Sequence, residues 1–194
     1  MSAPTDLAAR VERYNALVRE AAALLPEFAH PALCPQLIAG AQVEANDYNP
    51  NQVAPPEMKL LAHSILRDGI TMPVVTAPHP DDETRRVVVD GFHRTTLAKT
   101  HPDVQATLHG YVPVVLLARE KAQLMASTVR HNMARGSHDV ELSSNLIAIL
   151  TKFDWTDEKI SEELGMDIDG ITRMKCIAGL GEVFADRDYS MAWE

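Results

Sequence analysis

Apolar residues recur at the spacing of an α-helix from residue 5 to residue 25, and Pro26 ends the run. The positions that share one helical face include Leu7, Val11, Tyr14 and Val18. We therefore expect a helix whose apolar stripe packs against the main domain or against a second subunit. The stretch 26–56 holds six prolines and ends in YNPNQVAPP, a composition typical of a turn or surface loop.

Helical and strand patterns then alternate. The predicted elements are a helix over about 57–67, a β-hairpin over 70–90, a helix over about 92–100 and a strand over about 111–117. The run Val87-Val88-Val89 indicates a strand buried on both faces, and Pro113 favours an edge strand or a strand start. From Lys121 on, every segment has a helical pattern. The sequence thus predicts a mixed α/β part to about residue 118, followed by an all-α part.

Composition and charge narrow the class of protein. The chain has 194 residues with a formal net charge of −9, which disfavours non-specific nucleic-acid binding because phosphate contacts need surplus cations. No apolar run is long enough for a bilayer, and the first residues lack an apolar signal core. Cys34 and Cys176 are too few for a disulfide framework. We expect a cytoplasmic protein that makes no membrane contact.

The stretch VVVDGFHRTTLAK, residues 87–99, carries the most informative chemistry. A buried strand ends in Asp90-Gly91, and a helix begins directly afterwards. The first N–H groups of a helix attract anions, and Gly91 lets a ligand approach the backbone. Arg94 offers a planar fork for phosphate, and His93 and Thr95 add donors. Two interpretations stay open: a phosphate site, or turn chemistry in which Arg94 pairs with a nearby carboxylate.

Three ordered motifs in this chain resemble the ParB/sulfiredoxin superfamily. GITMPVV, residues 69–75, matches its G-hydrophobic-x-x-P element. Gly91 and Arg94 match its G-x-x-R motif. HNMAR matches its E-N-x-x-R motif through Asn132 and Arg135. The resemblance covers roughly residues 44–180 and implies an α+β fold, a small mixed sheet with helices, followed by an all-α domain of helix-turn-helix type.

The resemblance implies a site for a nucleoside triphosphate, CTP or ATP, with Mg²⁺. The residues that it assigns to phosphate are Gly91, His93, Arg94, Thr95, Asn132 and Arg135. Asn132 would also contact the metal, and the loop from Gly69 to Pro73 would lie against the base. His131 stands where the family has glutamate, which argues against efficient hydrolysis more than against binding.

The resemblance also implies partners. The family often dimerises through the helices after the third motif, so we expect a homodimer. Within the family, the chain most resembles ParB-like co-activators that are found beside PAPS-reductase-like proteins. This resemblance suggests a PAPS-reductase-like protein partner. The predicted function is a nucleotide-binding switch or transcription regulator acting on DNA or on a protein.

Two other functions stay open. The first is an ATP- or ADP-dependent small-molecule kinase of serine type, which needs a general base; Asp90, His93 and Glu57 are the candidates. The second is an adaptor with a vestigial pocket.

The helical tail has the spacing of a helix-turn-helix. The positions that fit its apolar, small and turn residues are Ile160, Ser161, Leu164, Gly165 and Ile171. The tail is acidic, with 5 Lys and Arg against 11 Asp and Glu from residue 151 on. The second helix has Arg173 and Lys175 as its DNA-binding candidates. We therefore expect DNA contact that is weak alone, with protein docking or core packing as alternatives.

The sequence divides into three predicted regions. Residues 1–43 form an N-terminal helix and a proline-rich lead-in, residues 44–120 the nucleotide-binding domain, and residues 121–194 the helical domain. Within the hairpin turn, Asp81, Asp82 and Glu83 form an acidic cluster. Its position in a turn favours a solvated turn over a metal site.

Overall fold

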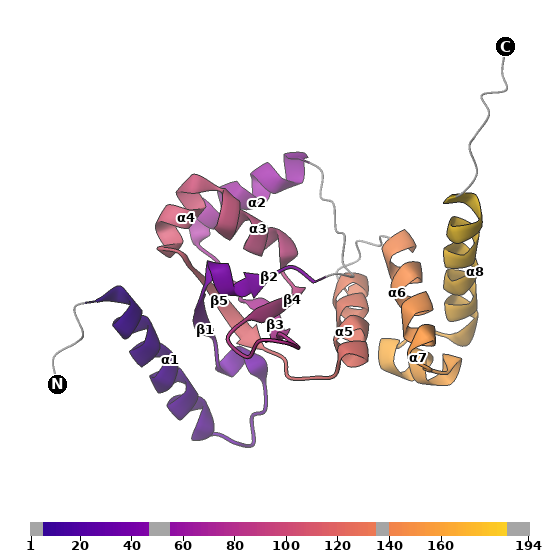
Figure 1. Cartoon of the computed structure of the whole chain (residues 1–194), viewed down its shortest axis with the longest axis horizontal. Coiled ribbons are helices and arrows are strands. Elements are labelled where there is room, and N and C mark those ends of the chain that lie inside the picture. Colours follow the sequence, from indigo (N-terminus) through magenta and orange to yellow (C-terminus); the bar gives the residue numbers. More distant parts are fainter. Residues whose placement is uncertain (1–5, 47–54, 135–139, 186–194) are drawn as a thin grey trace, which may run out of the picture. The chain divides into compact units, whose positions relative to one another are not determined.

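The computed structural model describes residues 6–46, 55–134 and 140–185 (Figure 1). The chain separates into two compact units, Met1–Arg119 and Glu120–Glu194, which are described in turn. Within the described residues, none of the helices combines the length and apolarity that a bilayer crossing requires.

A mixed five-stranded sheet organises the first unit. Its strands are β1 (Gln36–Ala39), β2 (Val43–Glu44), β3 (Val74–Pro78), β4 (Arg86–Asp90) and β5 (Tyr111–Leu116). They lie in the order β1-β5-β3-β4-β2, with β1/β5 and β3/β4 antiparallel and β5/β3 and β4/β2 parallel. The predicted hairpin is thus β3 and β4. Val88 and Val89 point to opposite faces of β4 and both are buried, which confirms a strand covered on both sides.

Helix α1 (Leu7–Ala23) docks on the edge strand β1 through one polar side chain. The Asn15 amide donates to the carbonyl of Leu37 at 2.8 Å, and its carbonyl oxygen accepts from the Leu37 N–H at 2.8 Å. The side chain therefore satisfies the edge of β1 as another strand would. Two short 3₁₀ turns, η1 (Pro31–Leu33) and η2 (Gly40–Gln42), flank β1.

Pro113 predicted an edge strand or a strand start, whereas it lies within β5, an interior strand between β1 and β3. On the β1 side its partner is Leu37, whose N–H and carbonyl are both bonded to Asn15. On the other side the pairing with β3 begins at Val74, opposite Val114. Pro113 therefore lies just before the paired stretch of β3, where the missing N–H is tolerated.

Three helices gather on one side of the sheet: α2 (Pro55–Asp68), α3 (Phe92–Thr100) and α4 (Pro102–Leu108) (Figure 1). Ala98 of α3 joins the valines of the sheet in one buried cluster. Leu97 of the same helix packs with Ala62 and Ile65 of α2 and Val104 of α4 in a second cluster. Helix α3 thus packs against both the sheet and the other two helices.

The acidic hairpin turn between β3 and β4 is organised by Asp82. Its carboxylate accepts hydrogen bonds from the Thr84 hydroxyl at 2.6 Å and the Thr84 N–H at 2.9 Å. These bonds, with smaller contributions from Arg85 and His79, hold the pKa of Asp82 below its ordinary value of 3.8. Among the described residues no group of three or more His, Cys, Asp or Glu could hold a metal ion. The acidic cluster is a hydrogen-bonded turn.

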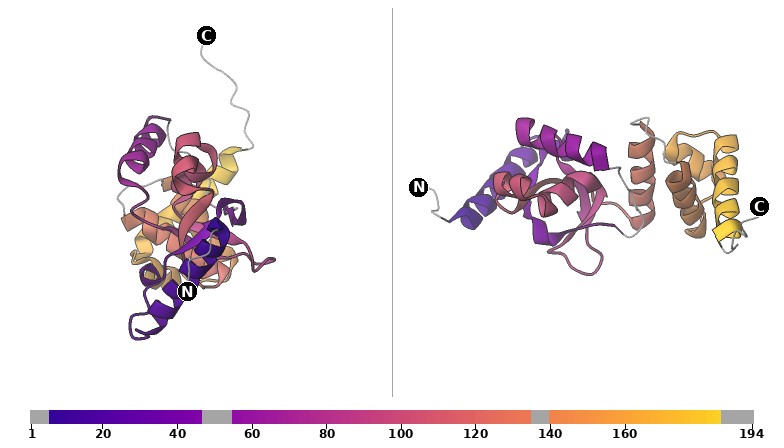
Figure 2. Two further views of the ribbon diagram at one scale, coloured as in Figure 1. Left: turned by 90° about the vertical axis from the view of Figure 1, so that its left-hand side faces the viewer. Right: turned by 90° about the horizontal axis from the view of Figure 1, so that it is seen from above.

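The second unit contains α5 (Lys121–Ala134), α6 (Val140–Lys152), α7 (Asp157–Leu164) and α8 (Ile168–Ala185). Helices α6 and α8 run side by side (Figures 1 and 2). The guanidinium of Arg130 on α5 donates to the Glu163 carbonyl on α7 at 2.7 Å and to the Ser127 hydroxyl at 2.8 Å. A mixed sheet with helices followed by an all-α part is the predicted fold class, and the structure confirms it.

The predicted helix-turn-helix is formed by α7 and α8. Gly165 ends α7 in the left-handed conformation, with φ 68°, and the Ser161 hydroxyl donates to the Met166 carbonyl at 2.6 Å. Ile160, Leu164 and Ile171 are all buried. Each position therefore has the role that its spacing predicted, which explains why a small hydroxyl residue precedes the turn.

Candidate functional site

The turn between β4 and α3 has the geometry that a glycine permits. Gly91 is the N-terminal cap residue of α3 and has φ 97° and ψ 28°, a left-handed conformation unfavourable for other residues. The Gly91 carbonyl accepts from the Thr95 N–H at 3.0 Å and from the Thr95 hydroxyl at 3.1 Å. Thr95 is thus a buried brace of the turn, and its hydroxyl faces the helix backbone.

Arg94 folds back over this turn. A Cβ atom built on Gly91 would lie 2.8 Å from Arg94 Nη2 and 3.1 Å from its Nε. The guanidinium lies 3.6 Å from the Asp90 carboxylate, and both side chains are largely buried, with 14% and 10% of their surfaces exposed. The ion pair is one of the two interpretations that the sequence left open for Arg94. The phosphate role of the loop stays a prediction.

The same guanidinium reaches a second loop. Arg94 Nη1 donates to the carbonyl of Met72 at 2.6 Å. Met72 belongs to the loop from Gly69 to Pro73, which begins with Gly69 in the left-handed conformation after α2. Two of the three sequence motifs therefore meet at one arginine, although 22 residues separate them. The sequence could not identify Met72 as the acceptor, because every residue has a backbone carbonyl and only the fold decides which one lies near Arg94.

The remaining predicted residues lie in different places. His93 is half-buried in the first turn of α3, edge-on to the ring of Phe92 at 5.5 Å. Glu57 lies in the exposed first turn of α2. Asn132 falls in the last turn of α5, in the second unit, and its side chain lies outside the described part of the chain. Arg135 also lies outside the described residues. The structure thus assembles the Gly91 and Met72 loops, and the third motif remains a prediction.

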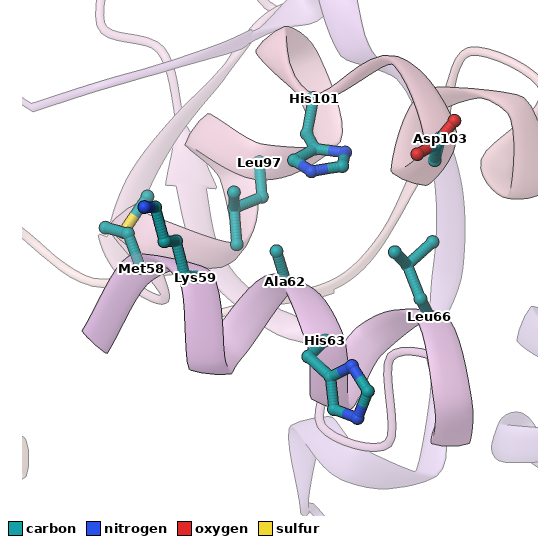
Figure 3. Close-up of a pocket in the computed structure, with 8 residues that line it drawn as sticks. All are labelled: Met58, Lys59, Ala62, His63, Leu66, Leu97, His101 and Asp103. Carbon is teal, nitrogen blue, oxygen red and sulfur yellow. The ribbon is translucent and has the colours of Figure 1, made fainter. Parts of the chain in front are cut away.

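A separate groove of about 360 Å³ lies between α2 and the α3–α4 corner (Figure 3). Its lining is mostly apolar and consists of Met58, Lys59, Ala62, His63, Leu66, Leu97, His101 and Asp103. None of the predicted site residues lines it. His101 Nδ1 is buried without a hydrogen-bond partner among the described residues. The groove is therefore distinct from the Gly91 turn, and none of the three sequence motifs contributes to its lining.

The cations predicted to contact DNA are partly engaged within the helix-turn-helix. The Lys175 ammonium pairs with the Asp157 carboxylate of α7. The exposed Arg173 donates through Nε to the Asp169 carbonyl at 3.3 Å. Asp157 was not recognised as a partner from the sequence, because the pair joins residues 18 positions apart on different helices.

A relative from Escherichia coli strain K12, the uncharacterized protein YbdM, is 46% identical to this chain over 163 residues. The match covers 84% of this chain and 77% of YbdM. The chain belongs to the YbdM family. In addition, residues 138–186 match the family model described as the IbrB-like C-terminal HTH domain, which covers α6, α7 and α8.

Two solved structures of the chromosome-partitioning protein ParB from Caulobacter crescentus are also similar. One, complexed with CTP-γ-S, has 19% identity and a TM-score of 0.46, with 78% of this chain and 87% of that chain covered. The other, complexed to the centromeric parS site, has 17% identity and a TM-score of 0.49, with coverage of 72% and 69%. The family model thus identifies a helix-turn-helix domain in the C-terminal part of the chain.

Proposed function

We propose that this chain is a nucleotide-binding regulator whose Gly91 turn holds the phosphates of a nucleoside triphosphate, CTP or ATP. The observation that carries the proposal is the position of Arg94, whose guanidinium lies over Gly91 and bonds to the Met72 carbonyl. One cation thus spans the turn at a helix N-terminus and the loop expected to face the base. Phosphate groups in proteins are commonly bound by a cationic side chain together with the N–H groups of a helix N-terminus.

A polyphosphate competes well for this arginine. The Met72 carbonyl to which Arg94 Nη1 donates is a neutral acceptor, and the Asp90 carboxylate is a charged one. A phosphate group offers bidentate, charged acceptors in place of both. The Asp90 carboxylate would repel bare phosphate, but it is the type of oxygen ligand that Mg²⁺ prefers. In the proposal the Asp90 carboxylate faces the metal, and the nucleotide binds as its Mg²⁺ complex.

The helix-turn-helix domain is the proposed output. Its shape supports DNA or protein docking, whereas the Asp157–Lys175 pair and the acidic residues Asp167 and Asp169 reduce its attraction for phosphates. We infer that DNA contact by this domain is weak in the isolated chain and that a second copy or a protein partner, such as a PAPS-reductase-like protein, supplies further contacts. Phosphoryl transfer has less support, because Asp90 is held by Arg94 and Glu57 begins another helix.

Binding of one nucleotide should appear as a rise in thermal stability. With CTP, ATP, ADP and GTP offered in turn, each with and without Mg²⁺, we expect one triphosphate to stabilise the chain only when Mg²⁺ is present. Ligand at 100 times its Kd adds about 2.7 kcal/mol to the free energy of unfolding. Chromatography of the recovered nucleotide tells binding from hydrolysis. If none of the four shifts the transition, the nucleotide proposal fails and the adaptor function takes its place.

DNA contact should depend on the two cations of α8. Changing both Arg173 and Lys175 to alanine should weaken DNA binding and lower the slope of log K against log salt by about 2, since each lost phosphate contact removes close to one unit. Asp157→Asn should have the opposite effect, because it releases Lys175 from its ion pair. Lys59→Ala, on the exposed side of α2, is the control. If the variant with both substitutions keeps the DNA affinity and the salt slope of the wild type, the two cations do not contact DNA and the domain serves protein docking instead. Fluorescence anisotropy over a salt series measures both quantities.

A further inference from the structure

Helix α1 carries a second apolar stripe beside the face that docks on the sheet. Val11 and Asn15 are buried against the first unit. On the neighbouring flank, Leu7, Tyr14, Leu17 and Leu24 are exposed, with 44% of Tyr14, 45% of Leu17 and 79% of Leu24 open to solvent. Figure 1 shows β1 beside one flank of α1 and no other labelled element along the opposite flank. A run of large apolar residues exposed on a docked helix marks an interaction surface.

The stripe has a seven-residue repeat. Positions 7, 14 and 21 form one row and positions 10, 17 and 24 form the other, which is the a/d pattern of a helix-pairing seam. When two copies of α1 are laid antiparallel about their midpoint, Leu7 faces Leu24 and Tyr14 faces Leu17. Arg10, the charged member of the stripe, faces Ala21, its small member. The long Arg10 side chain therefore meets the position with the most room.

The charges beside the stripe complement the same alignment. Arg13 and Glu20 occupy consecutive g positions and are both exposed. In the antiparallel pair, Arg13 of each copy lies across from Glu20 of the other copy, which places two ion pairs symmetrically along the seam. Across the described residues, neither side chain makes an intramolecular ion pair.

The opposite orientation is disfavoured by the same residues. In a parallel, in-register pair, Arg10 would face Arg10 across the seam, and Arg13 would lie beside the e position of Val18 with no acidic partner. The stripe is thus complementary to itself in one orientation only. A two-fold axis through the middle of α1 makes every contact twice, as a closed dimer requires.

We propose that this flank of α1 is a homodimer interface, in which two copies of the helix pair antiparallel through Leu7, Tyr14, Leu17 and Leu24. Because α1 is 17 residues long, the seam extends about 25 Å. Asn15 fixes each helix to its own sheet, so the dimer would join the two copies through their β1 edges. This interface is independent of the nucleotide site and of the helices that follow the third motif.

Analytical ultracentrifugation of the full chain tests the interface without nucleotide. We expect the weight-average mass to rise with concentration towards twice the 21.4 kDa of one chain. Leu17→Glu should leave a monomer, because it places a carboxylate against Tyr14 of the partner. Leu60→Glu is the control, since Leu60 is an exposed leucine on α2, with 70% of its surface open. Circular dichroism confirms that both variants keep their helix content.

A charge exchange gives the sharper result. Arg13→Glu and Glu20→Arg should each weaken the dimer about tenfold, because each places like charges across the seam twice. The double variant Arg13→Glu/Glu20→Arg should regain the affinity of the wild type. A wild-type chain that stays monomeric at millimolar concentration would overturn the proposal. So would a dimer that is indifferent to Leu17→Glu, or a double variant that is as weak as the single ones.

Discussion

An Arg94→Ala chain is expected to lose the stabilisation that the proposed nucleotide ligand confers. The substitution removes the guanidinium that lies over Gly91 and bonds to the Met72 carbonyl, so the proposed site loses its charged phosphate donor. It also leaves the largely buried Asp90 carboxylate without this cation, and we expect the unliganded chain to lose about 1–3 kcal/mol of unfolding free energy. Isothermal titration measures the nucleotide affinity directly, and a denaturant titration measures the stability.

The controls separate a lost ligand contact from a damaged fold. Arg67→Ala removes an exposed arginine from the last turn of α2 and should change neither quantity. Arg94→Lys keeps the charge without the planar fork, so it should retain part of the affinity. An Arg94→Ala chain that is destabilised but still binds nucleotide at full affinity would mean that Arg94 serves the turn alone. The phosphate assignment of the Gly91 turn would then be wrong.

Gly91→Ala is expected to combine backbone strain with displacement of Arg94. At φ 97° a side chain adds about 1–2 kcal/mol of strain. The new Cβ would also lie 2.8 Å from Arg94 Nη2, so the guanidinium must move from its place over the turn. We expect lower thermal stability together with a nucleotide affinity at least tenfold weaker, measured by differential scanning fluorimetry and isothermal titration.

The fold supplies a matched control for the backbone strain. Gly110 has φ 82°, yet a Cβ built there meets nothing within 4 Å. Gly110→Ala should therefore lose a similar amount of stability and keep the full nucleotide affinity. If the two alanine variants bind nucleotide equally well, the position of Arg94 over Gly91 has no part in ligand binding. The comparison thus tests the geometry of the turn rather than the need for glycine as such.

The sequence alone was sufficient for the elements whose cause is local. The β3–β4 hairpin, the buried valines of β4 and the turn at Gly165 follow from residue patterns over a few positions, because pleat, periodicity and turn conformation are short-range properties. The need for glycine at position 91 is of the same kind. The sequence placed a glycine between the strand and the helix, and the structure adds that Gly91 has a left-handed conformation there.

The tertiary structure decided which groups those local elements meet. It joined Arg94 to Met72, Asn15 to the edge of β1 and Lys175 to Asp157, and it explained how Pro113 is accommodated inside the sheet. A carbonyl or a carboxylate far along the chain has no periodic signal that marks it as a partner, because its role depends on how the helices and strands pack. The sequence determined the motifs and the mixed α/β and all-α parts, because these depend on local patterns. Packing decided that Arg94 lies in an ion pair with Asp90, because that contact depends on how the first turn of α3 folds back over Gly91.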